Sequence, residues 1–106
     1  MNKARRNRLE AAGWKFGSAQ DFLGLTDEEV RLIEIKIALS RGVRDLRREL
    51  GLTQSELAER LGSSQSRVAK IEGREGTVSI ELMVRALLAM GATARDVARL
   101  IARRVS

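Results

Sequence analysis

The stretch 53–72 constrains the fold more than any other part of the chain, because it contains two short helical segments separated by one glycine. Thr53 and Glu56 have the spacing of a capping box, in which each side chain accepts a hydrogen bond from the other residue's backbone amide at a helix start. Gly62 is placed to end the first segment, because glycine readily adopts the left-handed conformation of helix ends. The pattern predicts a helix, a tight turn and a second helix.

The second of these helices is predicted to bury one face and to expose the other. Ser63 or Ser64 can cap its start, and Val68 falls with Ile71 on the face that would turn toward the core. The outward residues are polar; they are Gln65, Ser66, Arg67 and Lys70. Glutamine can pair with adenine, and arginine or lysine with guanine, so this face could read base edges in a DNA major groove. A solvated helix surface would carry the same residue types.

The composition favours a small domain made almost entirely of helix. The chain has 106 residues and no proline, and alanine, leucine, arginine and glutamate are abundant. Its aromatic residues are one tryptophan and two phenylalanines, all before residue 25, so the core of the remainder must be aliphatic. The absence of cysteine and histidine excludes disulfides, the usual zinc sites and triads that need either residue. We therefore expect no enzymatic activity and no cofactor.

The charge of the chain favours a polyanionic partner. The net charge is +6, and contacts between basic side chains and phosphates release counterions and so supply affinity. The residues at 1–8 include Lys3, Arg5, Arg6 and Arg8 and no acid; they would form a basic arm along DNA or a solvated terminus. No apolar run approaches the roughly 20 residues of a membrane span, and no signal-peptide core follows the arm. We expect a cytoplasmic protein with no membrane partner.

A long helical stretch is predicted at 26–50. Thr26 and Glu29 form a capping box at its start. It carries two apolar rows, Val30, Ile33 and Ile37 in one and Leu32, Ile35 and Leu39 in the other. Two rows must be covered on more than one side, by a second subunit or by the segment that contains Trp14, Phe16 and Phe22. We expect a break at Ser40-Arg41-Gly42, which would leave an extra helix at 26–41.

Two further helices are predicted after a loop at 73–78. Ser79 can cap the first of them and Gly91 can end it. Thr93 and Asp96 form a capping box at the start of the second. The first is expected to bury Leu82, Met83, Val84, Leu87, Leu88 and Met90. The second carries an apolar stripe that closes the core or forms a dimer seam, made of Val97, Leu100, Ile101 and Val105, and it exposes Arg95, Arg99, Arg103 and Arg104.

A specific motif spans the predicted pair of helices. Its residues are Leu50-Gly51-Leu52-Thr53-Gln54, Glu56-Leu57-Ala58, Leu61-Gly62, Gln65-Ser66, Val68 and Ile71-Glu72-Gly73. On these residues the segment 43–88 resembles the Cro/cI-type (XRE) helix-turn-helix family of DNA-binding repressors. The resemblance implies an all-α, lambda-repressor-like five-helix DNA-binding domain with an N-terminal helical extension. We expect that domain at 26–106, after a basic arm and short N-terminal segment at 1–25. Members often carry Asn-Gly where this chain has Gly73-Arg74.

The resemblance also implies a function and a set of contacts. It implies a sequence-specific regulator of transcription, a repressor, that binds double-stranded DNA as a homodimer on half-sites roughly 34 Å apart. With the outward face of the second helix, it predicts DNA contacts by Gln54, Ser64, Gln65, Ser66, Arg67, Lys70 and Arg74. The resemblance also implies that Arg47 and Glu72 form a structural ion pair.

Two alternatives remain beside a plain repressor. Short members with extra N-terminal residues resemble antitoxins of the HigA type, which repress their own operon and neutralise a toxin protein. In that case residues 9–40 would contact the toxin or form the dimer. The other alternative is a protein–protein adaptor that keeps the fold and lacks operator specificity.

Overall fold

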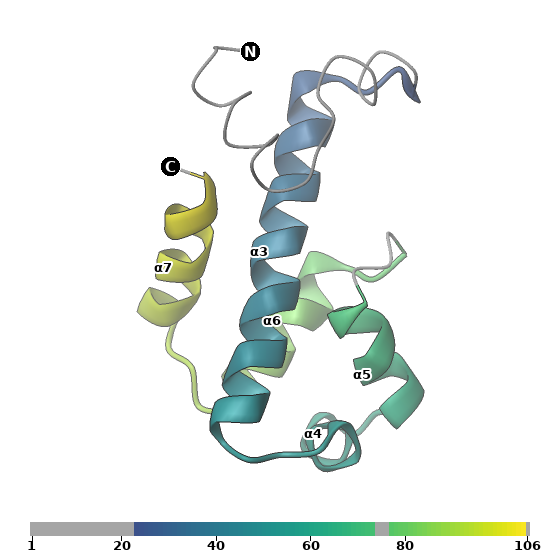
Figure 1. The fold of residues 1–106 in the computed structure, drawn as a ribbon, viewed down its shortest axis with the longest axis vertical. Coiled ribbons are helices and arrows are strands. Elements are labelled where there is room, and N and C mark those ends of the chain that lie inside the picture. The colour runs from purple at the N-terminus through teal and green to yellow at the C-terminus, as the bar shows by residue number, and fades with distance from the viewer. Residues whose placement is uncertain (1–22, 74–76, 106) are drawn as a thin grey trace.

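Every regular element in the described part of the chain is a helix, as the sequence predicts. The computed structural model describes residues 23–73 and 77–105 (Figure 1). The helices are α3 (Asp27–Glu49), α4 (Gln54–Leu61), α5 (Gln65–Glu72), α6 (Ile80–Ala89) and α7 (Ala94–Val105). The predictions for the basic arm, for Trp14, Phe16 and Phe22, for Arg74, and for the side chains of Arg104 and Val105 lie outside what is described. The fold is that of a lambda-repressor-like domain.

Side-chain caps set the helix starts, and each predicted cap in the described residues is present. At the start of α3 the Thr26 hydroxyl accepts from the Glu29 amide at 3.2 Å, and the Glu29 carboxylate accepts from the Thr26 amide at 3.0 Å. The same reciprocal pairs open α4 and α7. Ser64 caps α5, and Ser79 caps α6. Gly62 ends α4 with a φ of 62°, in the left-handed region where glycine is favoured.

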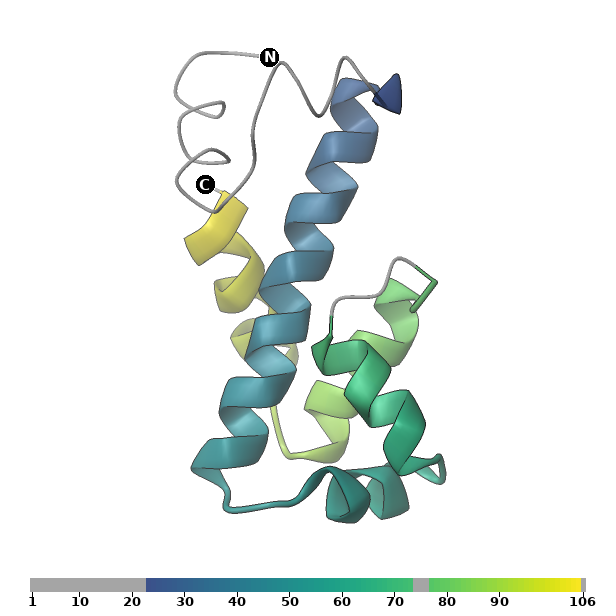
Figure 2. The same cartoon turned by 45° about the vertical axis from the view of Figure 1, so that its right-hand side comes forward.

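The core is aliphatic and is organised around α3. In Figures 1 and 2, α7 lies along one side of α3, and α4, α5 and α6 lie on the other. The fully buried side chains of this core come from four helices and include Leu39, Val43, Leu57, Val68, Ile71, Met83 and Leu87. Within the described ranges, no helix has the length and apolarity to cross a membrane.

The expected break at Ser40-Arg41-Gly42 is wrong, because α3 continues without interruption from Asp27 to Glu49. The small residues at this point serve packing between helices. A Cβ atom on Gly42 would lie 2.6 Å from a terminal methyl carbon of Leu100, so glycine lets α7 approach α3 closely. Ser40 turns inward on the side of α5, where its hydroxyl donates to the Ile71 carbonyl. The extra helix predicted at 26–41 is therefore the first part of α3.

Leu88 of α6, predicted to lie in the core, is at the surface, where the residue is 49% exposed. The buried residues of α6 are Met83, Ala86 and Leu87, followed by Met90 just after the helix. This spacing defines one face, and Leu88 lies about 100° around the helix from Leu87. Leu32 of α3 is exposed to the same extent, so the second apolar row of α3 is covered only toward Leu39.

Candidate nucleic-acid interface

The outward face of α5 is polar and open to solvent. Val68 and Ile71 anchor the helix in the core. The four polar residues between and before them are exposed; they are Gln65, Ser66, Arg67 and Lys70. In both views α5 lies across α3 from α7, at the edge of the molecule (Figures 1 and 2). The helix thus presents its polar residues on a surface that the other described helices leave accessible.

Gln54, at the first turn of α4, fixes the side chain of Gln65. The side-chain amide nitrogen of Gln65 donates to the side-chain carbonyl oxygen of Gln54 at 2.7 Å. The side-chain amide nitrogen of Gln54 in turn donates to the Glu72 carboxylate at 3.2 Å. A glutamine amide has two N–H donors and a carbonyl acceptor. After this bond, Gln65 retains one donor and its acceptor, which is the set that pairs with adenine.

Arg47 and Glu72 form a bidentate ion pair between α3 and the end of α5. The Arg47 Nε lies 2.6 Å from Oε2 of Glu72, and a second guanidinium nitrogen donates to Oε1 at 2.9 Å. The third nitrogen donates to the Leu52 carbonyl at 2.8 Å, before α4 begins. The two side chains are only 12% and 6% exposed. The pair therefore joins α3, the loop before α4 and α5 in one network with Gln54.

The surroundings of Glu72 change the pKa of its carboxyl. Burial opposes ionisation and would raise the pKa, but the hydrogen bonds from Arg47 and Gln54 favour the carboxylate and prevail. The net effect lowers the pKa of Glu72 below its ordinary value of 4.5. Hydrogen bonding to Glu72 raises the pKa of Arg47, so both groups are ionised at neutral pH.

This pKa shift predicts a loss of stability in acid. A carboxyl whose folded-state pKa is lowered stabilises the fold above its unfolded pKa, and this stabilisation is lost as the pH falls through the folded pKa. The free energy of unfolding of wild type should exceed that of Glu72→Gln near pH 7, and the difference should shrink below about pH 4.5. Urea unfolding at several pH values measures it, with Glu59→Gln, an exposed glutamate of α4, as the control. A difference that does not vary with pH would contradict the prediction.

A polar hollow of about 420 Å³ adjoins the exposed face of α5. Its lining comes from α5 and its cap, from the residues that lead into α6, and from the first turn of α6. It comprises Ser64, Ser66, Arg67, Lys70, Thr77, Val78, Ser79 and Leu82. Two cationic side chains and several hydroxyls are the groups that proteins use to hold DNA phosphates. The hollow brings Ser64 together with three of the four exposed residues of α5.

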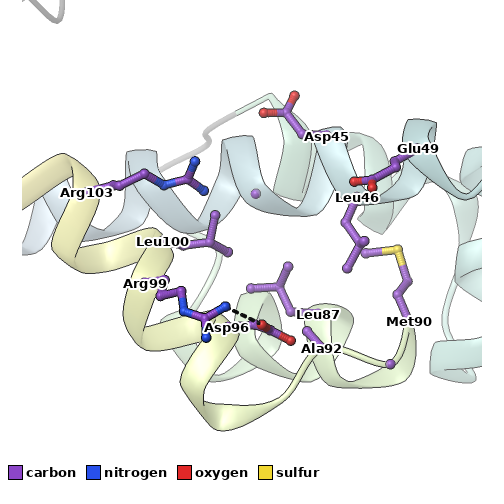
Figure 3. Close-up of a pocket in the computed structure, with 12 residues that line it drawn as sticks. Asp45, Leu46, Glu49, Leu87, Met90, Ala92, Asp96, Arg99, Leu100 and Arg103 are labelled. Carbon is purple, nitrogen blue, oxygen red and sulfur yellow. Dashed lines mark hydrogen bonds and ion pairs between the residues drawn. The ribbon is translucent and has the colours of Figure 1, made fainter.

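A second hollow, of about 390 Å³, lies between α3, α6 and α7 (Figure 3). Its floor is apolar, with Leu46, Leu87 and Leu100. Charges of both signs stand at its rim, where Arg99 lies 3.5 Å from Asp96. None of the residues predicted to contact DNA lines it.

Ser40 is the residue near this interface that the sequence analysis missed. The local sequence at 40–42 predicts a helix break, whereas Ser40 is buried and bonded to α5. A single serine at helical spacing from Ile37 and Val43, both core residues, is the signal that marks an inward hydroxyl.

The sequence profile of a family described as helix-turn-helix matches residues 43–100. The chain belongs to the Cro/cI-type helix-turn-helix family. This Cro/cI-type protein is a DNA-binding regulator of transcription. Comparisons with curated proteins and with solved structures found no match. The family match begins at Val43, so the first part of α3 lies outside it.

Proposed function

We propose that this regulator reads a specific DNA sequence with α5 in the major groove, where Gln65, Ser66, Arg67 and Lys70 meet base edges and adjacent phosphates. The main support for this proposal is the exposure and the hydrogen bonding of the Gln65 side chain. The side chain is exposed, and its hydrogen bond to Gln54 leaves the donor and acceptor that adenine requires. Arg67 and Lys70, exposed on the same helix, suit guanine or phosphate.

The surroundings of α5 support phosphate contacts on both sides of the groove. Gln54 lies at the N-terminal end of α4, where free backbone amides and the helix dipole favour an anion. Ser64 lines the polar hollow beside α5, together with Arg67 and Lys70. In this proposal Gln54 and Ser64 contact phosphates. Arg74 follows Gly73 in the chain, next to the end of α5, and completes the set of contacts.

We further propose that the protein binds DNA as a homodimer and acts as a repressor. A single helix of eight residues reaches only a few base pairs. Two copies related by a two-fold axis would read two half-sites roughly 34 Å apart. A bound dimer of this kind would occlude the DNA that it covers, which is sufficient for repression.

A more specific version of this proposal adds a toxin protein as a second partner. Residues 9–40 precede the family match and include the first part of α3. In an antitoxin that segment would contact the toxin. A growth-inhibiting product of a neighbouring reading frame, neutralised by coexpression of this chain, would support the antitoxin role, and the absence of any such product would leave a regulator alone.

An adaptor without operator specificity is the competing function. It would use the same fold for protein contacts and would need no base-reading residues. The exposed set on α5 and the polar hollow beside it favour DNA over this alternative.

Replacing Gln65 or Arg67 with alanine should lower affinity for the preferred duplex by about 1–3 kcal/mol, because each removes contacts to a base edge. The preferred duplex is first selected from a random library, and binding is then measured against a scrambled duplex of equal length. Arg95→Ala, an exposed arginine on α7, is the matched control and should change neither affinity. An equal loss on both duplexes would contradict base reading, and a wild-type protein that selects no sequence would favour the adaptor.

A further inference from the structure

The carbonyl of Ile71 receives a hydrogen bond from outside its own helix. Ile71 lies in the last turn of α5, where a helix leaves carbonyl groups without intrahelical donors. The Ser40 hydroxyl of α3 donates to this carbonyl at 2.7 Å. Ser40 is 1% exposed, and Ile71 is fully buried, so water does not compete for the bond. Removing a hydrogen bond from a buried carbonyl costs stability, because water cannot replace the lost donor.

The Ser40 bond attaches α3 to the end of α5 at a second point, in addition to the ion pair of Arg47 with Glu72. Arg47 holds Glu72, and Ser40 holds the neighbouring Ile71. Residues seven apart lie on the same face of an α-helix, so the two attachments come from one side of α3. One attachment fixes a distance, whereas two at different points along α3 also restrict the rotation of α5 against it.

We infer that Ser40 is a positioning residue, which sets the orientation in which α5 presents its polar face to DNA. This inference rests on the proposed function, in which α5 reads bases. Base readout requires side chains to be held within fractions of an ångström by their supporting residues. A side chain larger than serine would push α5 from α3 at this fully packed point, and a smaller one would remove the hydroxyl bond to the Ile71 carbonyl. Ser40 precedes the family match at 43–100, so this attachment comes from outside the matched segment.

The test compares wild type with Ser40→Ala in two measurements. In Ser40→Ala without DNA, amide hydrogen exchange near the end of α5 should be about 5- to 10-fold faster than in wild type, because the loss of one hydrogen bond weakens that end locally. Exchange in α7 should not change and serves as the internal reference. The ratio of affinities for the library-selected and scrambled duplexes should fall by about 5- to 10-fold, while the scrambled affinity stays within about twofold. Both are measured at a temperature where every variant is fully folded.

Two further variants separate positioning from general destabilisation. Val97→Ala removes buried volume on α7 and should lower the melting temperature without changing the affinity ratio. Ser40→Cys keeps a hydrogen-bond donor at this position, but a weaker one on a larger sulfur atom, so its affinity ratio should fall below that of wild type. It also supplies the comparison if Ser40→Ala does not fold.

The outcomes distinguish this inference from the function on which it rests. A wild type that selects a sequence, with an unchanged ratio in Ser40→Ala, would overturn the role of Ser40 alone. An equal fall in Val97→Ala would also overturn it, since the effect would then be one of stability. A wild type that selects no sequence would overturn the proposed function, and the exchange measurement would then decide only whether Ser40 holds α5.

Discussion

Replacing Arg47 with methionine should lower the free energy of unfolding by about 3 kcal/mol, because the substitution strands a buried charge. Glu72 would remain at the end of α5 with its side chain only 6% exposed, and it would lose both guanidinium hydrogen bonds. The Leu52 carbonyl would lose its donor as well. Methionine retains much of the volume of the arginine stem, so the loss reports charge and hydrogen bonding more than packing.

Urea unfolding at neutral pH measures this effect against two matched variants. Arg48→Met, at an exposed position next along α3, should change stability by no more than about 0.5 kcal/mol. The double variant Arg47→Met with Glu72→Met should recover much of the loss, because it leaves no unpaired charge. Strictly additive losses from the two single variants would show that Arg47 and Glu72 do not act as a pair.

The second large effect is expected at Leu39, where alanine should cost about 2–5 kcal/mol of unfolding free energy. Leu39 is 0% exposed and packs in the same core as residues of α4, α5 and α6. It precedes the segment that the family profile matches, so the prediction tests whether the first part of α3 belongs to the DNA-binding domain. The cost arises from lost burial and from the cavity that the smaller side chain leaves.

Leu32 provides the control for Leu39 on the same helix. The residue is 49% exposed, so Leu32→Ala should cost far less than Leu39→Ala in the same urea or thermal unfolding measurement. Equally small costs at the two positions would mean that residues before Val43 add little to the core. Such a result would also weaken the role given to Ser40, which follows Leu39 in the chain.

The local features of the fold could be predicted because they depend on residues close in sequence. Capping boxes such as Thr53 with Glu56 join residues three apart, and the left-handed end at Gly62 depends on one residue. The inward face of α5 follows from the spacing of Val68 and Ile71. These signals need no knowledge of which helices meet.

The features that sequence reasoning missed depend on contacts between distant helices. Ser40 and Gly42 suggest a helix break when only their neighbours are considered, whereas α5 and α7 approach α3 at these positions. The exposure of Leu88 depends on where the neighbours of α6 end. The ion pair of Arg47 and Glu72 was implied by the family resemblance, since no local rule joins residues 25 apart.

Gln65 illustrates how far the interface itself could be predicted. The residue type and the helical period place it on the outward face, and its exposure agrees with that placement. The hydrogen bond to Gln54, which settles which of its groups remain available, depends on the angle between α4 and α5. The base that Gln65 meets depends in addition on the DNA.

The uninterrupted course of α3 has a consequence for how related chains can change in length. Each residue inserted into a helix rotates everything beyond it by about 100°. An insertion or deletion between Ser40 and Arg47 would therefore turn one of the two groups that hold α5 away from it. The count of residues between these two positions should stay constant among relatives that keep both groups.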